Sequence, residues 1–153
     1  MSGGMHHSRM KAFLVLALVL QPFVLLPAAQ VTSDSAAYAQ MGSEKNPQAK
    51  KKLALNFEKN YPKSKRLPEV YMELSRALVA ESDFTTAKQY AEKAVNTVAK
   101  MKTQPAPEEY TDTTWHQWLG TIDTSAKNNL AWVNQMLAWQ SQQLRNTLHT
   151  RPR

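Results

Sequence analysis

The spacing of the apolar residues is the feature that most constrains the fold of this chain. From residue 47 onward they recur at helical intervals. Ala49, Leu53 and Phe57 are the first example, spaced as on one face of an α-helix. No segment after residue 39 alternates apolar and polar residues as a half-buried strand does. The spacing predicts an all-α fold with helices near 47–60, 68–81, 84–102, 108–122 and 125–148.

Residues at the predicted helix ends support these boundaries. Asn46 is a good N-cap, and Pro47 suits the first helical position because an N–H there has no intrahelical partner. Asp83 can cap a later helix in the same way. Asn60 can take the left-handed conformation that ends a helix, and Pro62 prevents the helix from continuing.

Three alanines lie on one stripe of the predicted helix 84–102, namely Ala87, Ala91 and Ala94. Small side chains on one face leave little to separate that helix from its neighbour. The stripe therefore predicts close packing of this helix against the one before it.

A longer pattern spans residues 57–101. It reads Phe57-x3-Tyr61-Pro62-x-Ser64-x3-Pro68-x2-Tyr71-x2-Leu74, and then Ser82-Asp83-Phe84-x2-Ala87-x6-Ala94. This pattern resembles the tetratricopeptide repeat, and in particular the periplasmic repeat proteins of the outer-membrane-assembly and Tol-associated kinds. The resemblance implies antiparallel helical hairpins. In the first helix it places Tyr71 at the bulky position, Leu74 as its apolar partner and Ser75 as the small residue beside them.

The chain also departs from the family pattern. Ser75 and Ser82 stand at positions where small residues or glycine are expected, and Ala91 replaces a usual aromatic residue. The usual period of about 34 residues fails, whereas an offset of 44 pairs Tyr71 with Trp115. We interpret this as a second, degenerate hairpin. The expected fold is a short α-solenoid of about two and a half units, capped by its last helix or by self-association.

Residues 1–39 differ in kind from the rest of the chain. A basic start at Arg9 and Lys11 precedes a largely apolar stretch over 12–26, the layout of a secretory signal peptide. A membrane span needs about 20 continuous apolar residues, and this stretch is shorter and interrupted. We expect 1–39 to be a signal peptide and polar spacer, and 40–153 to be the helical domain. The mature protein would then be periplasmic or secreted; the alternative is an uncleaved membrane anchor.

Two cleavage sites fit this interpretation. Ala37-Tyr38-Ala39 is a small-x-small motif, and a second candidate lies near Ala28 or Ala29. Residues 40–46 are polar and expected to be loose. The chain has no cysteine, which excludes a lipid anchor on cysteine, disulfides and cysteine metal sites.

Basic residues concentrate in one segment. Between Glu44 and Arg66 there are eight basic and two acidic residues, while the whole chain has a net charge of +7. An exported protein meets anionic lipid, acidic glycans or acidic proteins rather than nucleic acid. The segment predicts, as an alternative function, docking on an anionic envelope surface. The residues concerned are Lys50, Lys51, Lys52, Lys59, Lys63, Lys65 and Arg66.

Motifs for catalysis are missing. After residue 39 the only glycines are Gly42 and Gly120, too few for a phosphate-binding loop. His116 and His149 have no metal-ligand spacing, and the sequence after residue 39 contains no G-x-S-x-G or S-x-x-K motif. We therefore expect a protein that is not an enzyme and needs no cofactor or metal.

Four tryptophans, Trp115, Trp118, Trp132 and Trp139, have helical spacing. This spacing favours a role in the core over an aromatic-lined groove. Trp139 is expected to be partly exposed, because glutamines surround it at 140, 142 and 143.

The favoured function is an exported, non-catalytic scaffold or adaptor that binds a peptide or helix of another protein. The family resemblance implies a concave face lined by the first helices of the hairpins. Its expected contributors are Glu73, Ser75, Arg76 and Val79. Trp139 is a further candidate for contact with the partner.

Overall fold

The computed structural model describes residues 33–149, with side chains described as far as Thr147. This part of the chain contains five α-helices and no strand, which confirms the all-α prediction. The helices are α1 (Asp34–Ser43), α2 (Pro47–Asn60), α3 (Leu67–Ala80), α4 (Phe84–Met101) and α5 (Asp112–His149). The predicted signal peptide falls mainly on residues 1–32, which lie outside the described part.

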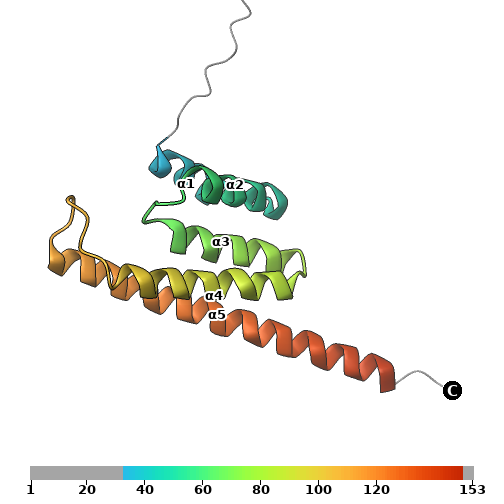
Figure 1. Ribbon diagram of the computed structural model, residues 1–153. Helices are drawn as coiled ribbons and strands as arrows, with labels where there is room; N and C mark the ends of the chain where they lie inside the picture. The colour runs from blue at the N-terminus through green and yellow to red at the C-terminus, as the bar shows by residue number, and fades with distance from the viewer. Residues whose placement is uncertain (1–32, 150–153) are drawn as a thin grey trace, which may run out of the picture. The chain divides into compact units, whose positions relative to one another are not determined.

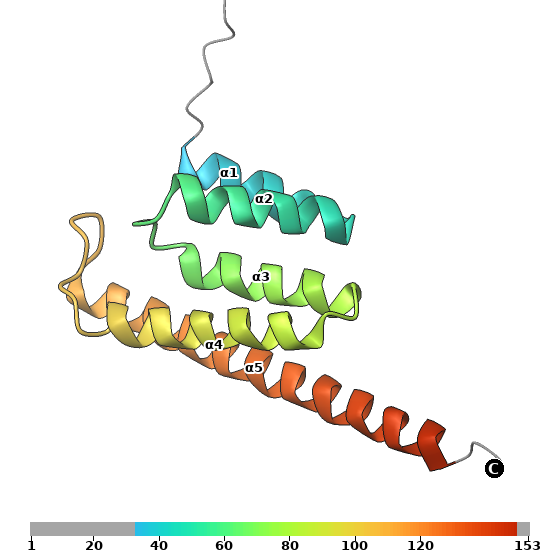
Figure 2. The ribbon, with the colours of Figure 1, turned by 45° about the vertical axis from the view of Figure 1, so that its right-hand side comes forward.

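The helices stack in chain order. Each runs antiparallel to the one before it, so that α1, α3 and α5 point one way and α2 and α4 the other (Figure 1). Consecutive helices are in contact, and α5 packs against α4 while also reaching α3 (Figure 2). The core therefore lies along α3 and α4, between α2 on one side and α5 on the other.

Capping residues set the starts of two helices as the sequence predicts. The Asn46 side chain accepts hydrogen bonds from the backbone N–H groups of Gln48 and Ala49 at 3.0 and 3.1 Å, and Pro47 is the first residue of α2. The Asp83 side chain accepts from Thr86 N–H at 3.2 Å. These bonds satisfy amides that have no partner within their helix.

The left-handed residue is not where the sequence placed it. Asn60 is the last residue of α2, and the C-cap is Tyr61 with φ −128°. Among the described non-glycine residues, positive φ occurs at Ser82, with φ 64°. Ser82 lies in the tight turn between α3 and α4, where a residue without Cβ would be under less strain.

The alanine stripe of α4 is buried as predicted. Ala87, Ala91 and Ala94 each have 0% exposure and belong to the main hydrophobic core. Ala54 on α2 and Ala126 on α5 are equally buried. Small residues on three helices therefore sit in the core where these helices meet.

The prediction of a polar spacer up to residue 39 and a loose segment over 40–46 was wrong for residues 34–43, which form α1. The Ser33 side chain caps this helix by accepting a hydrogen bond from Ala36 N–H at 3.2 Å. Met41 is completely buried, and the Ser64 hydroxyl donates to the Asp34 carboxylate at 2.7 Å. Contacts with the rest of the fold hold α1 in place. The sequence of residues 34–43, which contains mostly small side chains, does not indicate these contacts.

The predicted break between 122 and 125 was also wrong, because α5 is continuous from Asp112 to His149. Residues 108–111 precede the helix. It begins after Thr111, whose hydroxyl accepts from Thr114 N–H at 3.2 Å while the Thr114 hydroxyl accepts from Thr111 N–H at 3.0 Å. Across the expected break, Lys127 pairs with Asp123 at 2.8 Å, one turn earlier. This segment contains no proline, so the backbone hydrogen bonds continue.

Candidate docking surface

Helix α5 is longer than the helices that cover it. Asn129 Nδ2 donates to Ser75 Oγ at 3.2 Å, which places the middle of α5 beside the middle of α3. Because the two helices run parallel, α5 passes the end of α3 at Ala80 and continues alone (Figures 1 and 2). Val133 is the last buried residue among the described side chains of α5. Residues 134–149, here called the overhang, span about 24 Å at 1.5 Å per residue.

Large apolar side chains are exposed along this end of α5. Trp132, Trp139 and Leu144 have exposures of 37%, 56% and 59%. Met136, half-buried, lies between the two tryptophans at helical spacing. The expected partial exposure of Trp139 is confirmed. Trp132, Met136 and Trp139 lie on one helix face, whereas Leu144 lies on another. Exposed apolar residues that gather on one face are typical of a surface that binds another protein.

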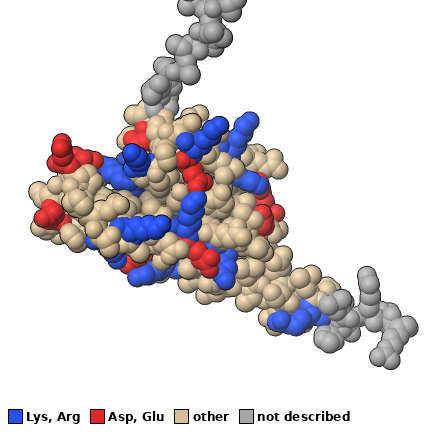
Figure 3. All heavy atoms as spheres, in the orientation of Figure 1, with Lys and Arg blue, Asp and Glu red and all other residues tan. Residues whose placement is uncertain are grey.

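The overhang carries little charge. Between residues 134 and 147 the only charged residue is Arg145, and the polar positions are filled mainly by glutamine and asparagine. The space-filling view shows the same contrast, since blue and red side chains crowd the other helices and are sparse here (Figure 3). A partner at this end of α5 would therefore make mainly apolar contacts and hydrogen bonds between uncharged groups.

The other two tryptophans belong to the core. Trp115 is 2% exposed and stacks on Trp118, with ring centroids 5.1 Å apart. Tyr110 packs against both rings, at centroid distances of 5.3 Å from Trp115 and 6.3 Å from Trp118. Two of the four tryptophans thus belong to the core and two are exposed. Their helical spacing in the sequence does not show which are which.

The residues expected on the concave face have different environments. Glu73 pairs with Lys50 of α2 at 3.1 Å and with Arg76 at 2.6 Å. Arg76 is exposed, whereas Val79 is half-buried and packs against the core. Ser75 was wrongly expected at the surface: it has 0% exposure, because α5 covers it and Asn129 is bonded to it. Ser75 is therefore part of the α3–α5 interface and cannot contact a partner.

Most of the predicted anion-binding residues are held in ion pairs. Four of the seven have a carboxylate partner, in the pairs Lys50–Glu73 at 3.1 Å, Lys51–Glu81 at 2.8 Å, Lys65–Glu109 at 2.7 Å and Arg66–Glu69 at 3.5 Å. Lys52, Lys59 and Lys63 have no ion pair within the described part of the chain. On the face shown in Figure 3, basic and acidic side chains alternate rather than form a basic patch. The ion pairs therefore offset part of the local excess of positive charge.

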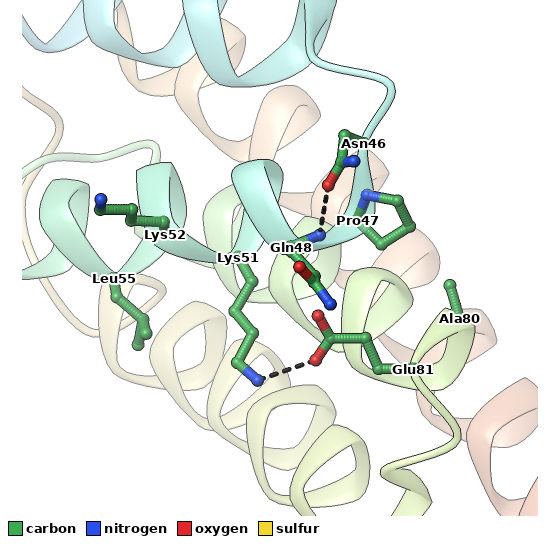
Figure 4. A pocket seen from close by; sticks show the side chains of 8 residues that line it. All are labelled: Asn46, Pro47, Gln48, Lys51, Lys52, Leu55, Ala80 and Glu81. Atoms are coloured by element: carbon green, nitrogen blue, oxygen red, sulfur yellow. Dashed lines mark hydrogen bonds and ion pairs between the residues drawn. The ribbon is translucent and has the colours of Figure 1, made fainter.

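A shallow hollow of about 840 Å³ lies between the start of α2 and the end of α3. Lys51 extends across it to Glu81, while Lys52 and Leu55 lie along its other side (Figure 4). Leu55 is 40% exposed. The N–H groups at the start of α2 are already bonded to Asn46, so this helix end is not free to bind an anion.

Two carboxylates at the α1–α3 contact have shifted pKa values in opposite directions. The hydrogen bond from Ser64 holds the pKa of Asp34 below its ordinary value, and the charge of Arg66 adds to the effect. Burial raises the pKa of Glu69, although the charge of Arg66 and the hydrogen bond from Tyr38 oppose this shift. Ionisation of Glu69 is therefore less favourable in the fold than in the unfolded chain.

No group of three or more His, Asp or Glu side chains is arranged to hold a metal ion within residues 33–147. None of the five helices is both long and apolar enough to cross a bilayer. The apolar stretch of the expected signal peptide or anchor, residues 12–26, lies outside this range.

Comparison with protein-family models, with curated proteins and with solved structures found no match for this chain. The chain contains an all-helical domain of five packed helices.

Proposed function

We propose that this chain is an exported, non-catalytic adaptor that binds a helix or peptide of another protein along the exposed face of α5. The observation that carries the proposal is the exposure of Trp132 and Trp139 where α5 extends past α3. Tryptophan is the residue type most enriched among those that dominate binding energy in protein interfaces. Met136 between the two adds a flexible side chain that adapts to different partner surfaces.

The shape of this face suits a helical partner. Trp132, Met136 and Trp139 follow helical spacing, so that they form one continuous stripe. A helix laid beside the stripe can insert its own apolar residues between them. Arg76 lies on the neighbouring helix α3 and is exposed, so it can supply a polar contact at the rim of such an interface.

Several observations support a tetratricopeptide-like arrangement as the framework of this adaptor. Consecutive helices are antiparallel, as in stacked hairpins (Figure 1). Ser82 is left-handed at the position where the family pattern has a small residue or glycine, and Ser75 is buried beneath the next helix. In this interpretation α1–α2 and α3–α4 are two hairpins, and α5 is the first helix of an incomplete third. Such a helix lacks the neighbour that would bury its remaining face.

A photo-crosslinking experiment in the native host tests the proposal. A benzophenone amino acid replaces Trp139 in one variant and Asn56, an exposed residue of α2, in a matched control. The expected result is a covalent product with one other protein from position 139 and none from position 56. Crosslinks only between copies of this chain, or equal products from both positions, would contradict the proposal.

Affinity measurements with the crosslinked protein would follow. Replacing Trp132 and Trp139 by alanine is expected to weaken binding by at least about tenfold, since interface tryptophans commonly contribute more than 1 kcal/mol each. The Asn56→Ala variant is expected to bind as the parent does. Unchanged affinity in the double variant would show that the partner binds elsewhere.

The alternative function, docking on an anionic envelope surface through the basic segment, has less support. Ion pairs occupy Lys50, Lys51, Lys65 and Arg66. Binding to anionic vesicles that falls steeply with salt, and is lost when Lys52 and Lys59 are changed to glutamate, would favour this alternative.

A further inference from the structure

A second concavity lies at the opposite end of the helices from the overhang. Its volume is about 510 Å³, and it lies where the α2–α3 link, the last turn of α4 and the α4–α5 link meet. Its size falls in the range of small-molecule sites, which is roughly 300–1,000 Å³. Lys63, Lys65 and Lys100 contribute to its lining, together with apolar residues from α3, α4 and α5.

The apolar part of the lining is buried. Leu67, Met101 and Trp115 are 7%, 9% and 2% exposed, and all three line the cavity. The indole Nε1–H of Trp115 is buried and has no hydrogen-bond partner within the described part of the chain. A buried donor without a partner is unfavourable, and such donors are rare unless a water molecule or a ligand satisfies them.

The lysines differ in how far they are already engaged. Lys65 pairs with Glu109 at 2.7 Å and lies over the Tyr110 ring at 4.5 Å. Lys63 and Lys100 are exposed and have no ion pair among the described residues. They come from the α2–α3 link and the end of α4, so two lysines without an ion pair line the same cavity from different elements.

We propose that this cavity binds a small ligand in which a carboxylate is joined to an apolar group. The apolar group lies against Leu67, Met101 and Trp115, and the carboxylate is held by Lys63 and Lys100. Glu109 beside Lys65 disfavours a doubly charged anion such as phosphate more than it disfavours a single carboxylate. This proposal rests on the cavity alone and is independent of the partner surface on α5.

The same chemistry has two sources, a free apolar acid and the C-terminus of a peptide that ends in an apolar residue. Isothermal titration of the full chain measures the affinity for one acid of each kind. Octanoate represents the free apolar acid, and an acetylated tripeptide with a free C-terminal leucine represents the peptide. The neutral counterparts are octanamide and the same tripeptide with a C-terminal amide. We expect at least one acid to bind at least about tenfold more tightly than its neutral counterpart, because charge-assisted hydrogen bonds are the stronger kind.

Matched variants locate the site. Lys63→Gln combined with Lys100→Gln is expected to weaken binding of that acid by about tenfold or more. The control, Lys52→Gln with Lys59→Gln, removes the same charge from exposed lysines of α2 that do not line the cavity, and should bind as the parent does. The proposal is overturned if neither acid binds better than its neutral counterpart, or if the control loses as much affinity as the cavity variant.

Discussion

Replacing Ser75 by alanine tests how α5 is held on α3. Ser75 and Asn129 are 0% and 5% exposed, and the bond between them joins residues 54 positions apart. The Oδ1 atom of Asn129 already has no partner among the described residues. Loss of the serine hydroxyl therefore leaves the whole amide group of Asn129 buried without a partner.

The expected loss in the free energy of unfolding comes from the buried, unpaired side-chain amide of Asn129. Leaving a buried polar group unsatisfied costs about 1–3 kcal/mol, and the deleted hydroxyl is too small to add a large cavity. In a domain of this size, each kcal/mol lowers the melting temperature by about 4 °C. Ser75→Ala is thus expected to melt about 4–12 °C below the parent.

Thermal and urea unfolding followed by circular dichroism measure the effect. Combining Ser75→Ala with Asn129→Leu replaces both polar partners by apolar groups, and this double variant should recover most of the lost stability. Ser141→Ala, on an exposed part of α5, is the matched control and is expected to change stability by less than about 0.5 kcal/mol. If Ser75→Ala unfolds as the control does, Asn129 is satisfied by other means and the reasoning fails.

Three further predictions concern stability. Met41→Ala should cost about 2–5 kcal/mol in urea unfolding, since Met41 is completely buried and its loss leaves a cavity beneath α1; a cost below 0.5 kcal/mol would mean that α1 does not pack on the core. Ser82→Gly should raise the melting temperature by a few degrees, because φ is 64° there and relief of this strain is worth up to about 1 kcal/mol; a lower melting temperature would contradict this. Glu69→Gln should be more stable than the parent at pH 7, with the difference vanishing below the ordinary pKa of 4.5. Burial raises the pKa of Glu69 in the fold, so its contribution to stability is present at low pH and lost as pH rises through that raised pKa; a glutamine variant that is less stable at pH 7 would refute this.

The middle of the fold could be predicted because its signals are local. Asn46 followed by Pro47, and Asp83 before Phe84, mark helix starts by chemistry that needs no tertiary contact. The bounds of α2, α3 and α4 agree with the prediction to within one residue. The alanine stripe was equally informative, since three small residues at helical spacing have few uses except close packing.

Longer-range contacts explain what could not be predicted. Three of the four partners of the basic segment lie far away in the sequence, as in the Lys65–Glu109 pair, so that a count of charges overestimates its free positive charge. Ser75 was assigned to the surface by family resemblance, and only the position of Asn129 shows that α5 covers it. The exposure of Trp132 has the same origin: it depends on where α3 ends relative to α5, which no local pattern encodes.

Helix α1 bears on where the proposed signal peptide would be removed. A cut after Ala39 takes away the first six residues of α1, including Asp34, which accepts a hydrogen bond from Ser64 at 2.7 Å. It also removes Tyr38, whose ring lies against Arg66 at 4.7 Å and whose hydroxyl donates to Glu69 at 3.4 Å. Met41 would then be left on a fragment of four helical residues, too short to persist as a helix by itself. A cut near Ala28 or Ala29 leaves α1 and its cap at Ser33 whole, so the packing of the domain favours the upstream site.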